Sequence, residues 1–424
     1  MAGQDTAYTI VPITAATREA FHQVDQAAFF FDETQETDEA LESLDLSRCF
    51  AATATGAAPF AGVYGSYDMA ITIPAPGGGL QAVPMAGLTW VGVHPDERRR
   101  GVMSQMVRHH FHEVRRQGVA LSGLHASEPT IYGRFGYGVA SLDAYLGLSR
   151  GDTLRAPALD AAAADVRTRV VALAGEGVAD RVHRMHVVLS GALMGAVTRT
   201  ERQARAMSRD FLPARRGSEP TQVLLAERDG EQVGYALFRR SSKWDEGRPQ
   251  GALSSREMMA ADSAALLALV RRLLDFDLTT SVTLKGRSLD DPVLWWAGGP
   301  RGASVKIYDG TWLRLVEVGA ALAQRGYATP VDVVIAVDDP FCPWNEGRWR
   351  LRCDGPGKAA TCERTEDTAG VRLPVQVLGS AYCGLRTIAA QQAEGTVAEV
   401  LPGSVAALSA AMATPRQPAA SIPF

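Results

Sequence analysis

Three consecutive arginines and a glycine, at 98–101, stand between an apolar run and a segment with helical periodicity. The first turn of a helix leaves backbone N–H groups without internal partners and carries partial positive charge, which suits an anion such as a phosphate. Guanidinium groups add paired donors, and a glycine lets the backbone approach a ligand closely. The stretch therefore predicts a pyrophosphate site, with a solvated basic turn as the alternative.

Two short apolar segments flank this basic loop and its helix. Residues 85–93 form a nearly continuous apolar run closed by a proline, which is typical of a strand covered on both faces. Apolar residues recur every three or four positions over 102–117, with charged residues opposite, so a helix is expected there. Residues 119–124 predict a second strand. We therefore expect a parallel strand-helix-strand crossover with the basic loop at the start of its helix.

The same order of elements recurs further along the chain without a basic loop. Residues 221–240 have the signature of a hairpin that turns at Asp229-Gly230, and 261–278 have that of a helix. Residues 301–424 change in character and suggest a small α+β domain. Three domains are expected, over residues 1–150, 151–300 and 301–424.

The overall composition is that of an ordinary globular protein. The chain has 424 residues, a formal net charge of -4 and 46% apolar residues, which favours neither nucleic acid nor a membrane surface as its main partner. Its longest apolar run, 187–197, is too short to span a bilayer, and its first residues lack the features of a leader, so a cytoplasmic protein is expected. Five cysteines without a C-x-x-C pair, and eight histidines without ligand spacing, support neither a disulfide framework nor a metal site.

The stretch VGVHPDERRRGVM resembles the coenzyme A loop of the GCN5-related N-acetyltransferases (GNAT), where Arg or Gln precedes x-x-Gly-x-Gly or Ala. Arg98 and Gly101 match this pattern, and Met103 departs from it. The resemblance implies that Val91 and Val93 present backbone groups to the pantetheine and the acetyl carbonyl of acetyl-CoA. It further implies that the coenzyme is held by Arg98, Arg99, Gly101, Met103 and Ser127.

Longer stretches resemble one branch of that superfamily, the enhanced intracellular survival (Eis) acetyltransferases. These stretches are HASEPTIYGRFGYGVAS at 125–141, DDPVLWW at 290–296, DGTWLRLVEVGAALAQRGYA at 309–328 and the terminal IPF. The resemblance covers essentially the whole chain. It implies an α/β (α+β) fold with tandem GNAT folds, the second one degenerate, followed by a sterol-carrier-protein-like α+β domain. It also implies acetyl-CoA as the cosubstrate and a homo-oligomer, namely a hexamer.

Acetyl transfer from a thioester to an amine needs a base for the amine and an acid for the departing thiolate. Tyr132 matches the family's general acid, and a phenol with an ordinary pKa near 10 stays protonated at neutral pH. On the residues alone, Tyr137 in the same loop is an equal candidate. The resemblance assigns the base to the C-terminal carboxylate, which here belongs to Phe424. The apolar end of the chain suits a docked terminus better than a solvated one.

Carboxylates accumulate between Arg18 and Arg48, where no basic residue occurs. In the Eis family the acceptor pocket lies beside this segment, so the cluster would attract a polycationic amine such as an aminoglycoside, a polyamine or a lysine side chain. We expect Asp32 and Trp90 to contact the acceptor. For most of the other carboxylates a solvated helix face is the alternative.

Two functions of different kinds compete. The first is an acetyl-CoA-dependent N-acetyltransferase that acts on primary amines by direct transfer in a ternary complex. The second is a lipid- or sterol-binding carrier with a vestigial acetyltransferase fold, because the C-terminal domain resembles sterol carrier proteins. Resemblance of fold does not transfer function. The most specific motifs lie at 91–138, so the enzyme is favoured and the C-terminal domain is expected to support the chain terminus.

Overall fold

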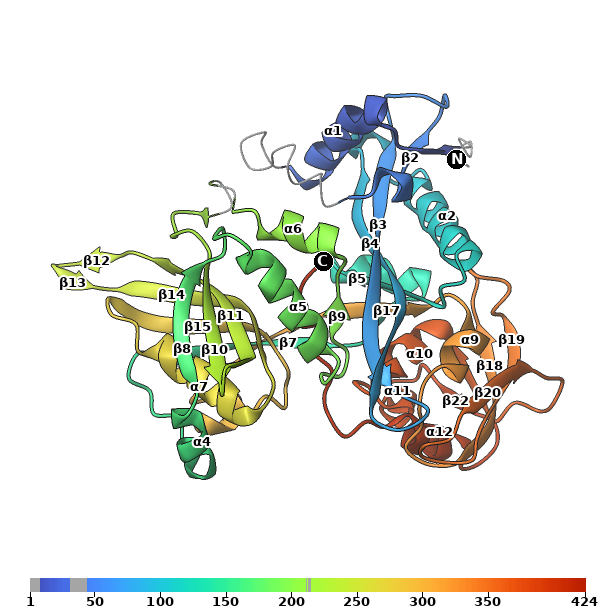
Figure 1. The fold of residues 1–424 in the computed structure, drawn as a ribbon. Coiled ribbons are helices and arrows are strands. Elements are labelled where there is room, and N and C mark those ends of the chain that lie inside the picture. The colour runs from blue at the N-terminus through green and yellow to red at the C-terminus, as the bar shows by residue number, and fades with distance from the viewer. Residues whose placement is uncertain (1–7, 31–43, 211, 213–214) are drawn as a thin grey trace. The chain divides into compact units, whose positions relative to one another are not determined.

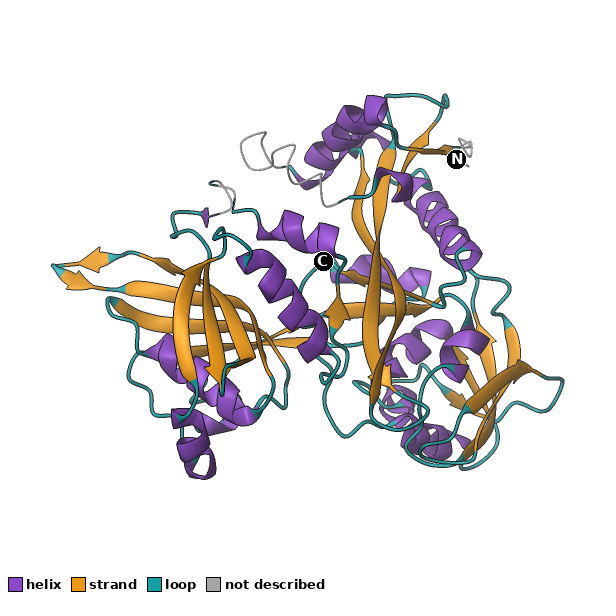
Figure 2. Cartoon of the chain, in the orientation of Figure 1, coloured by secondary structure: helices purple, strands orange, loops and turns teal. Residues whose placement is uncertain are grey.

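The computed structural model describes residues 8–30, 44–210, 212 and 215–424 (Figures 1 and 2). Contacts divide the chain into two compact units. The first unit holds the chain up to residue 140, residues 311–415 and Phe424, and the second holds 141–310 and 416–423. The chain thus leaves the first unit after residue 140 and returns to it at residue 311. The domain bounds expected near residues 150 and 300 stay a prediction.

The sheet at the N-terminal end of the first unit is antiparallel except at one pair of strands. Its order is β1 (Thr9–Pro12), β2 (Cys49–Thr53), β3 (Gly62–Pro74), β4 (Leu80–Val93), β5 (Leu121–His125), β17 (Thr311–Leu315) and β6 (Gly138–Val139). Strands β4 and β5 are parallel, and α2 (Val102–Arg116) joins them. The predicted strand-helix-strand unit with a helix at 102–117 is confirmed, although β4 begins five residues before the expected strand because its hairpin with β3 extends the apolar run.

Helices cover both faces of this sheet. Val63 of β3 packs with Phe21 of α1 (Arg18–Phe29), whereas the next residue, Tyr64, packs on the other face with Phe111 of α2. This alternation follows from the two-residue period of a strand. The sheet is therefore the middle layer, and α2 is fixed by its apolar stripe.

The sheet of the second unit repeats the parallel pair. Its order is β16 (Lys306–Asp309), β7 (Leu142–Ser149), β15 (Thr279–Arg287), β14 (Gly251–Ala260), β11 (Glu231–Ser241), β10 (Gln222–Arg228) and β8 (Arg167–Ala172). Strands β14 and β15 are parallel and joined by α7 (Ser263–Leu274). The predicted hairpin is confirmed, with its turn at Asp229-Gly230 between β10 and β11.

Helices of the second unit also pack on opposite faces of their sheet. Leu224 of β10 packs with α7, and its neighbour Val223 packs with α5 (Val178–Ser190). The helix expected over 261–278 is shorter in the structure, because the Asp262 side chain caps its N-terminus and it ends before Asp275. The remaining short elements of the unit are α4 (Asp160–Ala164), β9 (Val197–Thr198), α6 (Glu201–Ser208), β12 (Trp244–Asp245), β13 (Arg248–Pro249) and α8 (Pro292–Trp296).

A third sheet, in the first unit, is built from the C-terminal part of the chain. Its order is β20 (Ala360–Arg364), β19 (Gly347–Cys353), β18 (Val331–Asp338), β21 (Val371–Pro374) and β22 (Ala398–Glu399). Four helices accompany it: α9 (Val318–Ala323), α10 (Val375–Tyr382), α11 (Ile388–Ala393) and α12 (Ser404–Met412). Within the unit, the fully buried Arg314 of β17 donates to both carboxylate oxygens of Asp339, at 2.7 and 2.6 Å. The ion pair joins β17 of the N-terminal sheet to the turn after β18.

Within the described ranges, no helix combines the length and the apolar character that a membrane crossing requires.

Candidate active site

A cavity of about 670 Å³ lies in the first unit where β4 ends and α2 begins. Its walls come from the end of α1, the end of β4, the basic loop, the first turn of α2, the loop after β5 and one residue of the C-terminal part. Eight residues expected to bind the coenzyme or to act in catalysis line it: Val91, Val93, Arg98, Arg99, Gly101, Met103, Ser127 and Tyr132. These eight residues lie up to 41 positions apart in the sequence.

The parallel strands that frame the cavity pair over a very short length. Ala86 pairs with Ser122 and Gly87 with Gly123, and residues 88–93 of β4 continue without a partner on β5. Backbone N–H and C=O groups of a strand need hydrogen-bond partners. The edge of β4 that carries Val91 and Val93 can therefore accept the amide groups of a ligand as a strand would.

A bulge redirects β4 within this free stretch. Val63 pairs with Gly92 and Gly65 with Thr89, so β4 has one residue more than β3 between these pairs. Trp90 lies in the bulge with φ +53°, in the left-handed region. Bulges leave a residue outside the ladder and turn the backbone, and they recur beside active sites. Here the bulge comprises Trp90 and Val91.

The Trp90 side chain lies on the α1 face of the sheet. Its indole N–H donates to the Tyr67 hydroxyl at 3.0 Å, and its ring lies 6.4 Å from that of Phe21. The expected contact of Trp90 with the acceptor stays a prediction. Asp32, the other residue expected there, lies outside the described residues.

The structure distinguishes the three arginines of the basic loop. Arg100 pairs with Glu97 at 3.1 Å, and Glu97 also accepts the Tyr8 hydroxyl at 2.7 Å. Arg98 and Arg99 are exposed, and no carboxylate of the described residues pairs with either. Two uncompensated guanidinium groups therefore lie beside the positive end of α2, which favours an anion at this place.

Gly101 is the N-cap residue of α2 and has φ +82°, a conformation that favours glycine. A Cβ at this position would meet no protein atom within 4 Å. The glycine is thus required by the backbone turn, and the space next to it is left open. Met103, which departs from the GNAT pattern, is half-buried in the cavity wall with its Sδ 3.8 Å from Nη2 of Arg134.

The two candidate tyrosines differ in what their hydroxyl groups contact. Tyr137 is fully buried, and its hydroxyl lies 2.7 Å from that of Ser122, which is 2.8 Å from Nε2 of His110. Tyr132 lines the cavity at the end of α3 (Pro129–Tyr132). Burial, with a smaller contribution from the charge of Glu128, raises the pKa of Tyr132 to about 12. Tyr132 therefore keeps its proton at neutral pH.

The C-terminal residue lies against the N-terminal sheet at the point where β4 and β5 separate. A Cβ built on Gly87, the last residue of β4 that pairs with β5, would lie 3.2 Å from two ring carbons of Phe424. Phe424 belongs to the first unit, as do all residues of the cavity wall. The chain end is docked, as its apolar sequence suggested.

Three features of the cavity wall had no clear signal in the sequence. Phe341, from the loop after β18, packs edge-on against Phe135 with 4.9 Å between ring centroids, and Arg108 lies 4.4 Å above it. Arg134 adds a further exposed guanidinium. Phe30, which is 93% exposed, follows α1. Only the run of three phenylalanines at 29–31 could have drawn attention to the last of these.

Comparisons with known proteins agree with this architecture. Family models of an acetyltransferase (GNAT) domain match residues 9–140 and 195–315, and a sterol carrier protein domain matches residues 318–421. An uncharacterized N-acetyltransferase of Streptomyces avermitilis is 40% identical over 355 residues, which are 83% of this chain and 84% of that protein. The N-acetyltransferase Eis of Mycobacterium tuberculosis is 31% identical over 341 residues, 78% of each chain. The chain belongs to the Eis-type GNAT N-acetyltransferases.

The crystal structure of Eis1 from Mycobacterium abscessus resembles this Eis-type protein with a TM-score of 0.81 at 29% identity, over 98% of this chain and all of that one. The expected fold class, tandem GNAT folds followed by a sterol-carrier-like domain, is confirmed. The Eis-type chain is an acetyltransferase, and its GNAT domains imply acetyl-CoA as the cosubstrate.

Proposed function

We propose that this acetyltransferase transfers the acetyl group of acetyl-CoA directly to primary amines of polycationic acceptors, such as aminoglycosides, polyamines or lysine side chains, in a ternary complex. One observation carries the proposal. Arg98 and Arg99 at the start of α2, the free edge of β4 and the hydroxyl-bearing Tyr132 line a single cavity. An anion site, a strand-like edge and a proton donor are the parts that a thioester donor requires.

Donor binding is assigned to two parts of this cavity. Arg98, Arg99 and the first N–H groups of α2 hold the pyrophosphate, with Met103 and Ser127 on the wall beside it. The backbone of Val91 and Val93 pairs with the pantetheine amides and polarises the acetyl carbonyl. This assignment is supported by the β5-facing edge of β4, which pairs with no residue of β5 beyond Gly87.

Tyr132 is assigned as the general acid. The amine nitrogen attacks the thioester carbon, the C–S bond breaks, and the departing sulfur takes the proton of the Tyr132 hydroxyl. The same burial that raises the pKa of Tyr132 disfavours a thiolate nearby, so both groups favour their neutral forms. The raised pKa thus ensures that Tyr132 still carries the proton when the thiolate forms, and proximity in the cavity allows the transfer.

The carboxylate of Phe424 is assigned as the base. It accepts the proton that the amine nitrogen loses, directly or through a water molecule. The phenolate of Tyr132 regains a proton from solvent, and the terminal carboxyl releases one, so the cycle is balanced. A terminal carboxyl has an ordinary pKa near 3.5 and is a weak base. We therefore propose that the docked chain end offsets this weak basicity by holding the carboxylate next to the amine.

Three further assignments follow the Eis resemblance. Asp32 and Trp90 contact the acceptor, the chain acts in the cytoplasm, and the enzyme is a homo-oligomer, namely a hexamer. The sterol-carrier-like domain supports the cavity, since Phe341 forms part of its wall. A lipid carrier without transferase activity is the competing function.

The test is the release of free thiol from acetyl-CoA, recorded with a thiol reagent, with kanamycin, spermidine or a lysine peptide as acceptor. We expect thiol release that depends on both substrates, together with a gain of 42 Da per acetyl group on the amine. Absence of thiol release with all three acceptors, combined with binding of a fluorescent fatty acid or sterol, would favour the carrier.

A further inference from the structure

The second GNAT copy has its own pocket at the position that corresponds to the coenzyme cavity of the first. This pocket of about 210 Å³ is lined by the end of β14, the start of α7 and the end of β15. An anion does not suit it, because the Asp262 carboxylate occupies the helix start and accepts the Ala265 N–H at 2.8 Å. Residues of the C-terminal segment, including Arg416, Ala419 and Ser421, line the pocket instead.

Asp290, in the loop after β15, holds the beginning of that segment. Its Oδ2 accepts the backbone N–H of Gln417 at 3.1 Å and lies 3.1 Å from Nε of Arg416. The Ser288 hydroxyl donates to the Gln417 carbonyl, also at 3.1 Å. Hydrogen bonds to charged groups contribute more than neutral ones. Asp290 is therefore the first anchor of the segment.

The loop between α5 and β9 holds the next part of the segment. The Ala419 N–H donates to the Met194 carbonyl at 2.9 Å, and the Val197 N–H donates to the Ala420 carbonyl at 3.0 Å. The Ser421 hydroxyl lies 3.2 Å from both the nitrogen and the oxygen of Val197. Val197 is therefore the second anchor, and it engages the segment through its backbone.

The shape of the same loop leaves room for the segment. A Cβ on Gly195 would lie 2.8 Å from Cβ of Pro418, so only a glycine fits beneath the proline. Residues 418–422 are all buried. A buried, hydrogen-bonded stretch of this kind differs from the frayed end that most chains have.

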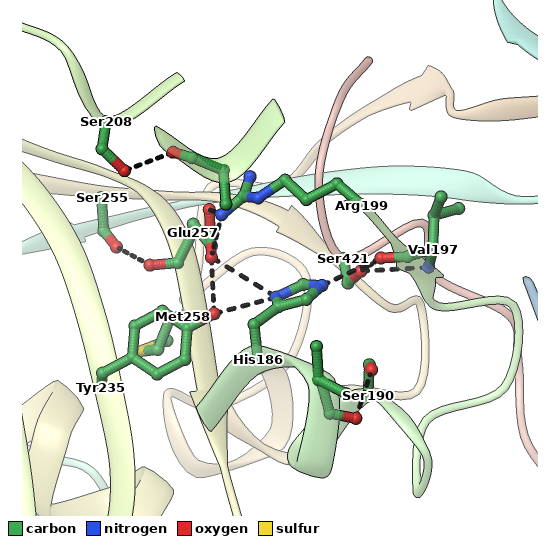
Figure 3. Close-up of polar contacts among 12 residues, drawn as sticks. His186, Ser190, Val197, Arg199, Ser208, Tyr235, Ser255, Glu257, Met258 and Ser421 are labelled. Carbon is green, nitrogen blue, oxygen red and sulfur yellow. Dashed lines mark hydrogen bonds and ion pairs between the residues drawn. The ribbon is translucent and has the colours of Figure 1, made fainter. Parts of the chain in front are cut away.

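A buried network of polar side chains contacts the carbonyl group of Val197 (Figure 3). His186 Nε2 lies 2.9 Å from the Val197 carbonyl oxygen, which can only accept, so this nitrogen donates. The other ring nitrogen lies 2.9 Å from the Tyr235 hydroxyl, which donates to Glu257. Arg199 donates to both oxygens of Glu257 at 3.2 Å. A fully buried network of this kind holds its members in one geometry.

We propose that the degenerate GNAT copy takes part in acetyl transfer as a holder of the C-terminal segment, with Asp290 and Ser421 as positioning residues for the Phe424 carboxylate. The role in catalysis rests on the proposed function, because it requires that carboxylate to be the base. Pro423 alone separates Phe424 from the buried residues 418–422, so release of the segment frees the terminal carboxylate as well.

The proposal is tested in the full-length enzyme by hydrogen-deuterium exchange and by steady-state kinetics. Asp290→Ala removes the first anchor, and Asp290→Asn keeps an acceptor for the Gln417 N–H. Asp275→Ala is the matched control, because Asp275 pairs with Arg272 in the same unit at the same 3.1 Å but contacts no residue of the segment. We expect a peptide covering 413–424 to exchange about tenfold faster in Asp290→Ala, close to wild type in Asp290→Asn, and unchanged in the control.

Steady-state kinetics distinguish a role in positioning the Phe424 carboxylate from a role in protein stability alone. In Asp290→Ala, kcat should fall about tenfold while KM for acetyl-CoA stays within about twofold, and Ser421→Ala should act in the same direction. If the peptide covering 413–424 exchanges equally fast in Asp290→Ala and in the control, the second GNAT copy does not hold the segment. Faster exchange with an unchanged kcat would overturn the positioning role and the base assignment, while donor binding would stand. If Asp290→Ala does not fold, Arg416→Ala tests the same anchor, since the Arg416 side chain is 65% exposed.

Discussion

The ring of Phe424 meets the imidazole of His125 edge-on, at 90° and with 4.9 Å between the ring centroids. His125 is the last residue of β5, and Gly87, which also lies beside the ring, is the last residue of β4 that pairs with β5. The terminal ring therefore lies where the two parallel strands part. This geometry makes the position of the last carboxylate sensitive to chain length.

Deletion of Phe424 should abolish turnover. The new carboxylate would belong to Pro423 and lie one residue, about 3.5 Å of chain, short of its place. We expect kcat to fall at least about 100-fold while KM or Kd for acetyl-CoA remains measurable, with thiol release and calorimetry as the assays. Phe424→Leu is the control, because it keeps the carboxylate and an apolar side chain. A fully active truncated enzyme would contradict the base assignment.

Tyr132→Phe should lower kcat without weakening donor binding. Loss of a general acid typically costs 10²–10⁴-fold, so we expect a fall of about 100-fold or more in the rate of thiol release. Tyr137→Phe is the matched control: it removes the hydroxyl that contacts Ser122 and should cost about 1 kcal/mol of stability with little change in kcat. An equal loss of kcat in both variants would point to packing instead of proton transfer.

Arg98→Ala and Arg99→Ala should each raise KM for acetyl-CoA about tenfold, since a charge-assisted contact to a phosphate contributes about 1.5–3 kcal/mol. Arg100→Ala, whose partner is Glu97, should change KM by less than about twofold. The difference should shrink as the salt concentration rises, because exposed charges are screened. Equal effects of all three substitutions would argue against a specific pyrophosphate contact.

Asp143 should make the second unit less stable as the pH rises. Burial, with a smaller contribution from Asp309, raises the pKa of the Asp143 carboxyl to about 6. The folded state therefore binds the proton more tightly than the unfolded one, so stability is greatest below about pH 4 and is lost between about pH 4 and 6. Asp143→Asn should stabilise the protein by about 2 kcal/mol at pH 8 and not at pH 4, measured by thermal unfolding. An equal gain at both pH values would rule out the charge as the cause.

The parts of the site that the sequence could predict are those with local signals. The arginine run, Gly101 and the periodicity of 102–117 lie within twenty residues and together define a helix start that suits an anion. The resemblance to a known family then added Tyr132 and Phe424, which composition and spacing alone left open. The bulge at Trp90 has no such signal, because it depends on how β4 pairs with β3.

Long-range packing accounts for what the sequence could not predict. The segment TWLRL at 311–315 has the character of a strand, but a period of two residues does not say which sheet it joins. It lies between β5 and β6, where its Arg314 forms a buried ion pair with the distant Asp339. Phe341 reaches the cavity through the same contact region, about 200 positions from Phe135.

The position of β17 in the N-terminal sheet limits which fragments of this chain can be expressed alone. A fragment that ends after the first GNAT stretch, at residue 150, lacks β17 and so leaves the outer side of β5 with unpaired backbone groups. Exposed strand edges of this kind recruit other chains and promote aggregation. Expression of the catalytic part alone should therefore give insoluble protein unless residues 311–315 are fused back onto it.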